Sequence, residues 1–90
     1  MTDCIEMHAI VKGRVQGVGF RATVRFYALQ LDLKGTVRNL SDGSVEIYAQ
    51  GSRQKLDDLI ARIKQNDGLI VVESIAVDYY EPVNMYDRFQ

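Results

Sequence analysis

A glycine-rich run over residues 13–21, Gly-Arg-Val-Gln-Gly-Val-Gly-Phe-Arg, constrains this chain more than any other stretch. Three of the seven glycines lie in it, at positions 13, 17 and 19. An alternating apolar stretch precedes the run and a stretch of helical period follows it, which predicts a strand–loop–helix junction. Glycines allow positive φ and close approach to a ligand, while the first helical turn offers unpaired N–H groups. Such a junction is suited to binding an anion.

Other nucleotide-binding motifs match parts of this run. Residues 17–22 satisfy G-x-G-x-x-A, the dinucleotide fingerprint, but 90 residues cannot supply a doubly wound sheet. The Gly-Lys-Ser/Thr ending of a Walker loop is absent. A turn that merely connects two elements is the remaining alternative. Arg21 favours the anion site, because its forked guanidinium falls in the first helical turn and can reach the same concavity.

Length, charge and cysteine content exclude several classes of protein. We expect residues 1–90 to form one domain. A formal charge of −1 gives no overall attraction for nucleic acid or anionic membrane, and no apolar run approaches the ~20 residues of a membrane span. The first residues show neither a basic stretch nor an apolar run, so we expect no secretory signal, and the one cysteine suits the cytoplasm. With one Cys and one His we expect no metal site and no cofactor.

Apolar periodicity predicts the element order β-α-β-β-α-β, an α+β ferredoxin-like fold. In this fold an antiparallel sheet of four to five strands carries two helices on one face. Within the first helix, Phe26 and Leu29 are expected to widen the buried face. Ser52 is the expected N-cap of the second helix. The expected strands cover residues 4–12, 36–40, 44–50 and 71–80, with a short fifth strand possible at 88–89, and the first helix covers residues 20–33.

The predicted topology carries Asn39 to the glycine loop. The first two strands run parallel with the third between them, so their carboxyl ends meet at one edge of the sheet. By alternation Asn39 lies on the same side as Val37, toward the helices. Asn39 then either belongs to the anion site or caps the turn at residues 41–43, and position alone does not choose between them.

The chemistry of this site points to phosphoryl transfer from a good leaving group. Backbone N–H groups, one arginine and one amide supply positioning and charge stabilisation, which are the main requirements of phosphoryl transfer. The sequence offers the site no carboxylate pair, nucleophilic cysteine or metal ligands. A carboxylate leaves without a general acid because its pKa is about 4, so acyl phosphates suit the site. Asn39 could orient the attacking water, whose proton the phosphate itself can accept.

The run over residues 13–21, followed by Gly35-Thr-Val-Arg-Asn-Leu-Ser-Asp-Gly-Ser-Val-Glu46, resembles the acylphosphatase family. The resemblance implies hydrolysis of the carboxyl–phosphate bond of a small acyl phosphate. Because the sequence offers the site no metal ligands, we expect this hydrolysis to be metal-independent, and we expect the protein to be a monomer. It carries the catalytic arginine onto Arg21 and the water-orienting asparagine onto Asn39. It carries the phosphate-binding loop, which Arg21 completes, onto Val15, Gln16, Gly17, Val18, Gly19 and Phe20.

Binding modules without catalysis are the rival class, because this fold also serves ligand sensing and RNA recognition. The sequence is also compatible with a module that senses phosphate or acyl phosphate without turnover. An RNA-binding sheet displays aromatic side chains for base stacking. The residues expected on the open face are mostly charged: Glu6, His8, Lys12, Glu46 and Tyr48. We therefore expect no nucleic-acid partner.

Overall fold

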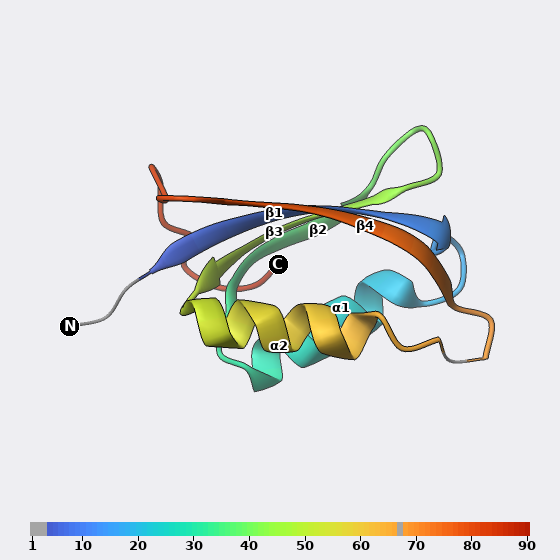
Figure 1. The fold of residues 1–90 in the computed structure, drawn as a ribbon, viewed down its shortest axis with the longest axis horizontal. Coiled ribbons are helices and arrows are strands. Elements are labelled where there is room, and N and C mark those ends of the chain that lie inside the picture. Colours follow the sequence, from blue (N-terminus) through green and yellow to red (C-terminus); the bar gives the residue numbers. More distant parts are fainter. Residues whose placement is uncertain (1–3, 67) are drawn as a thin grey trace.

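The computed structural model describes residues 4–66 and 68–90. Over these residues four strands form one sheet, and both helices lie on the same face of it (Figure 1). The element order confirms the predicted ferredoxin-like fold. In chain order the elements are β1 (Ile5–Arg14), α1 (Phe20–Gln30), β2 (Lys34–Asn39), β3 (Val45–Gly51), α2 (Arg53–Ile63) and β4 (Val71–Tyr80).

The strand order across the sheet is β2-β3-β1-β4, with every neighbouring pair antiparallel. Strands β1 and β2 are therefore parallel with β3 between them, as predicted. The register pairs Val37 with Ile47 and Asn39 with Val45. Since Ile47 and Val45 are buried against the helices, Asn39 lies on the helix side of the sheet, at the end of β2. The expected position of Asn39 is confirmed.

The core fills the space between the sheet and the helices. Alternate residues of β1 and β3 enter it, and α1 contributes Phe20, Val24 and Ala28 at a spacing of four. Phe26 and Leu29 were expected to widen this face, but they are 56% and 49% exposed. That expectation is wrong, because one narrow stripe suffices for a helix packed on one side.

The first helix ends earlier than its sequence pattern predicts. It stops at Gln30 rather than at residue 33, and Asp32 takes a left-handed conformation with φ of 57°. The Leu33 N–H then bonds to the Ala28 carbonyl at 2.9 Å, and the Leu33 side chain is buried. Apolar Leu33 thus belongs to the core but not to the helix.

In the second helix, the Ser52 side chain accepts a hydrogen bond from the Lys55 N–H, which confirms Ser52 as the N-cap.

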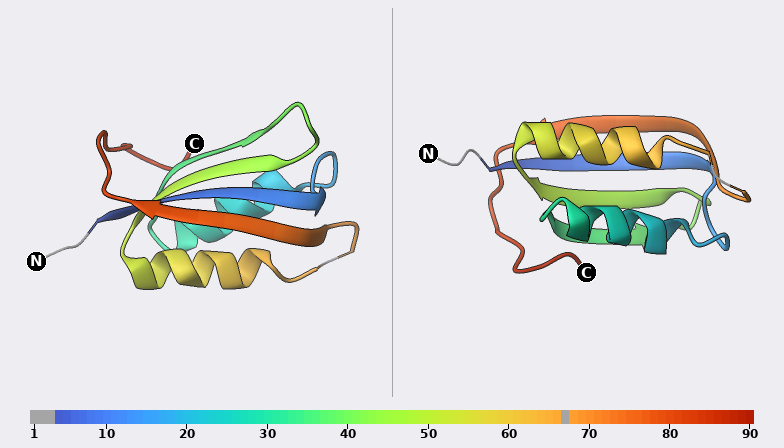
Figure 2. Two further views of the ribbon diagram at one scale, coloured as in Figure 1. Left: turned by 45° about the horizontal axis from the view of Figure 1, so that its top comes forward. Right: turned by 90° about the horizontal axis from the view of Figure 1, so that it is seen from below.

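The segment after β4 crosses the end of the sheet and reaches the outer edge of β2 (Figure 2). Phe89 is 1% exposed and forms a parallel bridge with Gly35. The Gly35 N–H donates to the Arg88 carbonyl at 3.1 Å, and Gln90 donates back to Gly35 at 2.9 Å. Over the described residues this pairing is a single bridge, so the possible fifth strand is reduced to an anchoring contact.

Neither helix in residues 4–66 and 68–90 has both the length and the apolar character needed to cross a membrane. Each of the two spans 11 residues.

Candidate active site

The glycine loop between β1 and α1 is held in place by two buried side chains at its ends. Val15 and Phe20 are each 1% exposed, whereas Gly17 and Gly19 are exposed. Both glycines have positive φ, 73° and 83°, and an added Cβ at either would meet no neighbour within 4 Å. Glycine is therefore required here for its backbone conformation rather than for lack of space. The ends of the loop are therefore fixed by burial, while its glycine backbone is exposed to solvent.

This loop contains a run of backbone N–H groups that have no hydrogen-bond acceptor among the described residues. In the part of the chain that the structure describes, those of residues 16–22 donate to no other protein group. The first partnered N–H is that of Thr23, which bonds to the Gly19 carbonyl at 3.1 Å. Within α1, whose residues are all described, the first turn holds no acidic residue and receives no side-chain cap. This helix end therefore presents partial positive charge to solvent.

A small hollow joins the loop to the end of β2. Its volume is about 180 Å³. We call it the loop hollow, and it is lined by Val15, Gly17, Gly19, Phe20, Arg21, Ala22 and Asn39. Arg21 and Asn39, 18 positions apart in the sequence, thus share one concavity with the glycines. Among the predicted loop residues, Gln16 and Val18 lie outside this lining.

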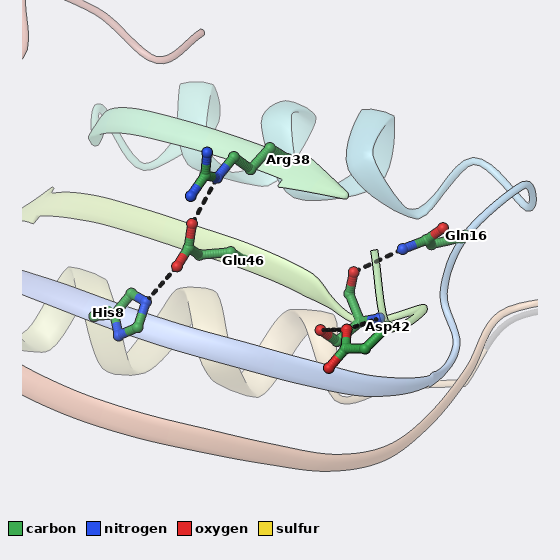
Figure 3. A network of polar contacts seen from close by, with 6 residues as sticks. His8, Gln16, Arg38, Asp42 and Glu46 are labelled. Atoms are coloured by element: carbon green, nitrogen blue, oxygen red, sulfur yellow. Dashed lines mark hydrogen bonds and ion pairs between the residues drawn. The ribbon is translucent and has the colours of Figure 1, made fainter. Parts of the chain in front are cut away.

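Gln16 instead ties the loop to the β2–β3 turn. Its side-chain amide donates to the carbonyls of Leu40 and Ser44, both at 2.8 Å. Figure 3 shows Gln16 directed at the turn that contains Asp42. Leu40 follows Asn39 directly, so the two bonds fix the end of β2 relative to the loop. Sequence reasoning placed Gln16 in the loop but missed this role, because its partners lie 24 and 28 residues away.

The turn itself is capped by Asp42. Its carboxylate accepts the Ser44 N–H at 2.9 Å and also the Ser44 hydroxyl. These hydrogen bonds, with the hydroxyl contributing most, hold the pKa of Asp42 below its usual value. In the described residues, the Asn39 side chain makes no hydrogen bond to the turn. The alternative role of Asn39 as the turn cap has no contact to support it.

The ion pairs of the described residues lie away from the loop hollow. No carboxylate there is within salt-bridge distance of Arg21, so its charge is available to a ligand. On the opposite face, Glu46 bridges His8 and Arg38, at 2.8 and 2.7 Å (Figure 3). The position of His8 on the open face is as predicted. Over the same residues, no group of three or more His, Cys, Asp or Glu side chains is arranged to hold a metal ion.

Comparison with known proteins identifies one family. The family model described as acylphosphatase matches residues 7–90. An acylphosphatase of Caldivirga maquilingensis is 44% identical over 90 residues, which are 99% of this chain and 95% of the relative. One of Koribacter versatilis is 48% identical over 81 residues, 90% of this chain and 74% of the relative. The crystal structure of acylphosphatase from Bacillus subtilis superposes with a TM-score of 0.90 at 36% identity, covering 94% of each chain.

Proposed function

The chain belongs to the acylphosphatase family of hydrolases acting on acyl phosphates, and from this premise we propose that Arg21 and Asn39 carry the hydrolysis without a metal ion. The observation that carries the proposal is the loop hollow. It brings a guanidinium, an amide and the glycine loop with its unpartnered N–H groups to one compact concavity. Each of these groups has a distinct task in the reaction.

The loop and Arg21 bind the phosphoryl group. The N–H groups of residues 16–22 and the positive end of α1 suit its oxygens. Arg21 adds a planar fork that pairs with two of those oxygens and neutralises charge. As the bond from phosphorus to the acyl oxygen breaks, negative charge spreads over the phosphoryl oxygens, where these donors already lie.

Asn39 orients the water that attacks phosphorus. An amide can accept a hydrogen bond from water through its oxygen and donate another to the phosphate through its nitrogen. The attacking oxygen forms the new bond to phosphorus, the carboxylate leaves with the electron pair, and the water proton passes to the phosphate. The leaving carboxylate needs no protonation, because the pKa of its acid is about 4.

Three further expectations belong to the same proposal. We infer that the protein acts as a monomer, in the cytoplasm and without a nucleic-acid partner. The single cysteine supports the cytoplasmic location, and the formal charge of −1 supports the absence of a nucleic-acid partner. Gel filtration of the purified chain tests the first of these expectations.

Release of inorganic phosphate tests the proposed function. We expect benzoyl phosphate and acetyl phosphate to be hydrolysed faster than they decay spontaneously, with the same rate in EDTA. Alkyl phosphate monoesters should be poor substrates, since nothing in the loop hollow protonates an alkoxide. Inorganic phosphate should inhibit competitively. Loss of activity in EDTA that a divalent ion restores would contradict the metal-free mechanism, and phosphate binding without turnover would favour the sensing module.

A further inference from the structure

The open face of the sheet carries a second and larger hollow, near the start of β1. Its volume is about 530 Å³, against about 180 Å³ for the loop hollow. Strands β1, β3 and β4 and the segment after β4 contribute its lining. The loop hollow lies at the other end of β1 and on the helix side. We call the larger concavity the tyrosine hollow, because Tyr48, Tyr80 and Tyr86 line it.

A buried glutamine gives the tyrosine hollow a fixed wall. Gln50 is 2% exposed, and its amide nitrogen donates to Glu6 and to the Asn84 carbonyl, both at 2.7 Å. Its amide oxygen accepts the Tyr86 N–H at 3.0 Å. These bonds hold the segment after β4 against the sheet, with Phe89 anchored further along. The concavity is therefore built into the fold, as preformed ligand sites usually are.

The lining combines aromatic rings with negative charge. Besides the three tyrosines it holds two carboxylates, Glu6 and Glu81. Among the described residues that line it, there is no lysine or arginine. The His8 ring also lines the hollow, where it stacks on Tyr48 with ring centroids 4.5 Å apart and its Nε2 contacts Glu46. Arg38 is paired with the same Glu46 at 2.7 Å.

We propose that the tyrosine hollow binds a small organic cation, an ammonium group on an apolar body. The faces of tyrosine rings attract cations, and the two carboxylates add charge complementarity. The exposed side chains of Val83 and Met85 at its rim can contact the apolar body of the ligand. The same carboxylates oppose the phosphates of nucleic acid, although the rings could stack on bases. This site is separate from the hydrolytic one, and the inference does not depend on the roles of Arg21 and Asn39.

A titration followed by ¹H–¹⁵N NMR tests the proposal on the full chain. The probe is 2-phenylethylammonium, and its matched neutral and anionic analogues are 2-phenylethanol and phenylacetate. We expect the ammonium probe to shift the amide signals of residues 6–8 and 80–86, and the analogues to bind several-fold more weakly. Added salt should weaken binding of the ammonium probe, because part of the attraction between probe and protein is electrostatic.

Two substitutions at exposed positions locate the site. Glu81→Gln should weaken binding of the ammonium probe about 2- to 5-fold, the usual effect of one exposed charge pair. Tyr80→Leu should weaken it by a similar factor of about 2 to 5, as expected for one exposed cation–π contact. The matched control is Glu73→Gln, which removes an exposed carboxylate from β4 outside the tyrosine hollow.

Several results would overturn the proposal. Equal binding of the three probes to the unmodified chain would remove the claim of charge recognition, whatever the variants do. Signal changes confined to residues 15–22 would place the probe at the loop hollow instead. Equal effects of Glu81→Gln and Glu73→Gln would show that the attraction depends on the net charge of the protein and not on this hollow. Shifts caused by a single-stranded oligonucleotide but not by the ammonium probe would identify a nucleic-acid surface.

Discussion

The two ends of β1 lead to two concavities of opposite character. At its carboxyl end, the loop hollow presents backbone N–H groups and the guanidinium of Arg21, and it is suited to an anion. Near its start, the tyrosine hollow presents carboxylates and aromatic rings, and it is suited to a cation. One strand of 10 residues separates them. A chain of net charge −1 thus keeps two local fields of opposite sign apart.

The difference lies in how each concavity is assembled. Among the described residues, the lining of the loop hollow comes from one continuous segment, residues 15–22, with Asn39 as the single residue from elsewhere. The tyrosine hollow draws its lining from three strands and the segment after β4. A site built on consecutive backbone groups leaves a motif in the sequence, whereas a site built from separated side chains leaves none.

Of all the substitutions considered, removal of Arg21 from the loop hollow should have the largest effect. Arg21→Ala should lower kcat/KM by about 10³–10⁵-fold, because one charge-stabilising arginine has that effect in phosphoryl transfer. Arg21→Lys should recover part of the loss, since a point charge cannot replace the planar fork. The control is Arg25→Ala, one helical turn further and also exposed. Near-normal hydrolysis of benzoyl phosphate by Arg21→Ala would place the site elsewhere, with Arg14 as the next candidate.

Asn39→Ala should affect the rate more than phosphate binding. We expect kcat to fall about 10²–10³-fold, the usual cost of one positioned polar group. The inhibition constant of inorganic phosphate should change little, because the interaction is made in the transition state. Asp42→Ala is the contrasting variant, as Asp42 caps the turn. It should lower Tm and leave turnover in the folded protein near normal. If Asn39→Ala melts early yet turns over normally, the water is oriented by another group.

Gln16→Met tests whether the loop and the end of β2 must be held together. The substitution keeps the length of the side chain and removes both donors to Leu40 and Ser44. We expect kcat to fall about tenfold, because small misplacements of catalytic groups are costly. KM should change less than kcat, and Tm should fall by a few degrees. Gln54→Met in α2, at an exposed position, serves as control. An unchanged kcat with a lowered Tm would make Gln16 purely structural.

The open face should influence stability rather than turnover, and its effect should depend on pH. Burial raises the pKa of Glu46, but hydrogen bonds from His8 and Arg38 outweigh it and leave that pKa below its ordinary value. A carboxyl whose pKa is lowered on folding stabilises the protein above its unfolded pKa of about 4.3 and loses that contribution as the pH falls. Tm should therefore drop on acidification, and less so in Glu46→Gln.

Thermal melts between neutral and acidic pH measure this effect. Glu73→Gln, at an exposed position on β4, is the control. Asp42 and Asp57 also have lowered pKa values and contribute to the same acid loss, so the comparison with Glu46→Gln isolates one part of it. Identical pH dependence in the unmodified protein and in Glu46→Gln would contradict the assigned role. Turnover at neutral pH should be unchanged in Glu46→Gln.

The sequence by itself determined the element order and the location of the glycine loop. Alternation in the strands and a spacing of four in α1 are local properties, and positive φ at residues 17 and 19 requires glycine whatever surrounds it. The topology then carried Asn39 to the loop, because parallel strands of this fold end at one edge. The same local reasoning set the first helix too long and misjudged Phe26 and Leu29, since periodicity shows which residues can be buried, not how wide a face the sheet covers.

The tertiary structure alone decided the contacts between distant segments. The bonds from Gln16 to the β2–β3 turn, the insertion of Phe89 beside Gly35 and the Gln50 network join residues at least 24 positions apart. The polar side chains among them have many partners of equal chemistry in the sequence, so spacing cannot select one. Tyr86 lines the tyrosine hollow together with Tyr48 because the segment after β4 crosses the end of the sheet, and no local propensity dictates that course. The reason is physical: propensity acts over a few neighbouring residues, whereas burial selects partners across the whole chain.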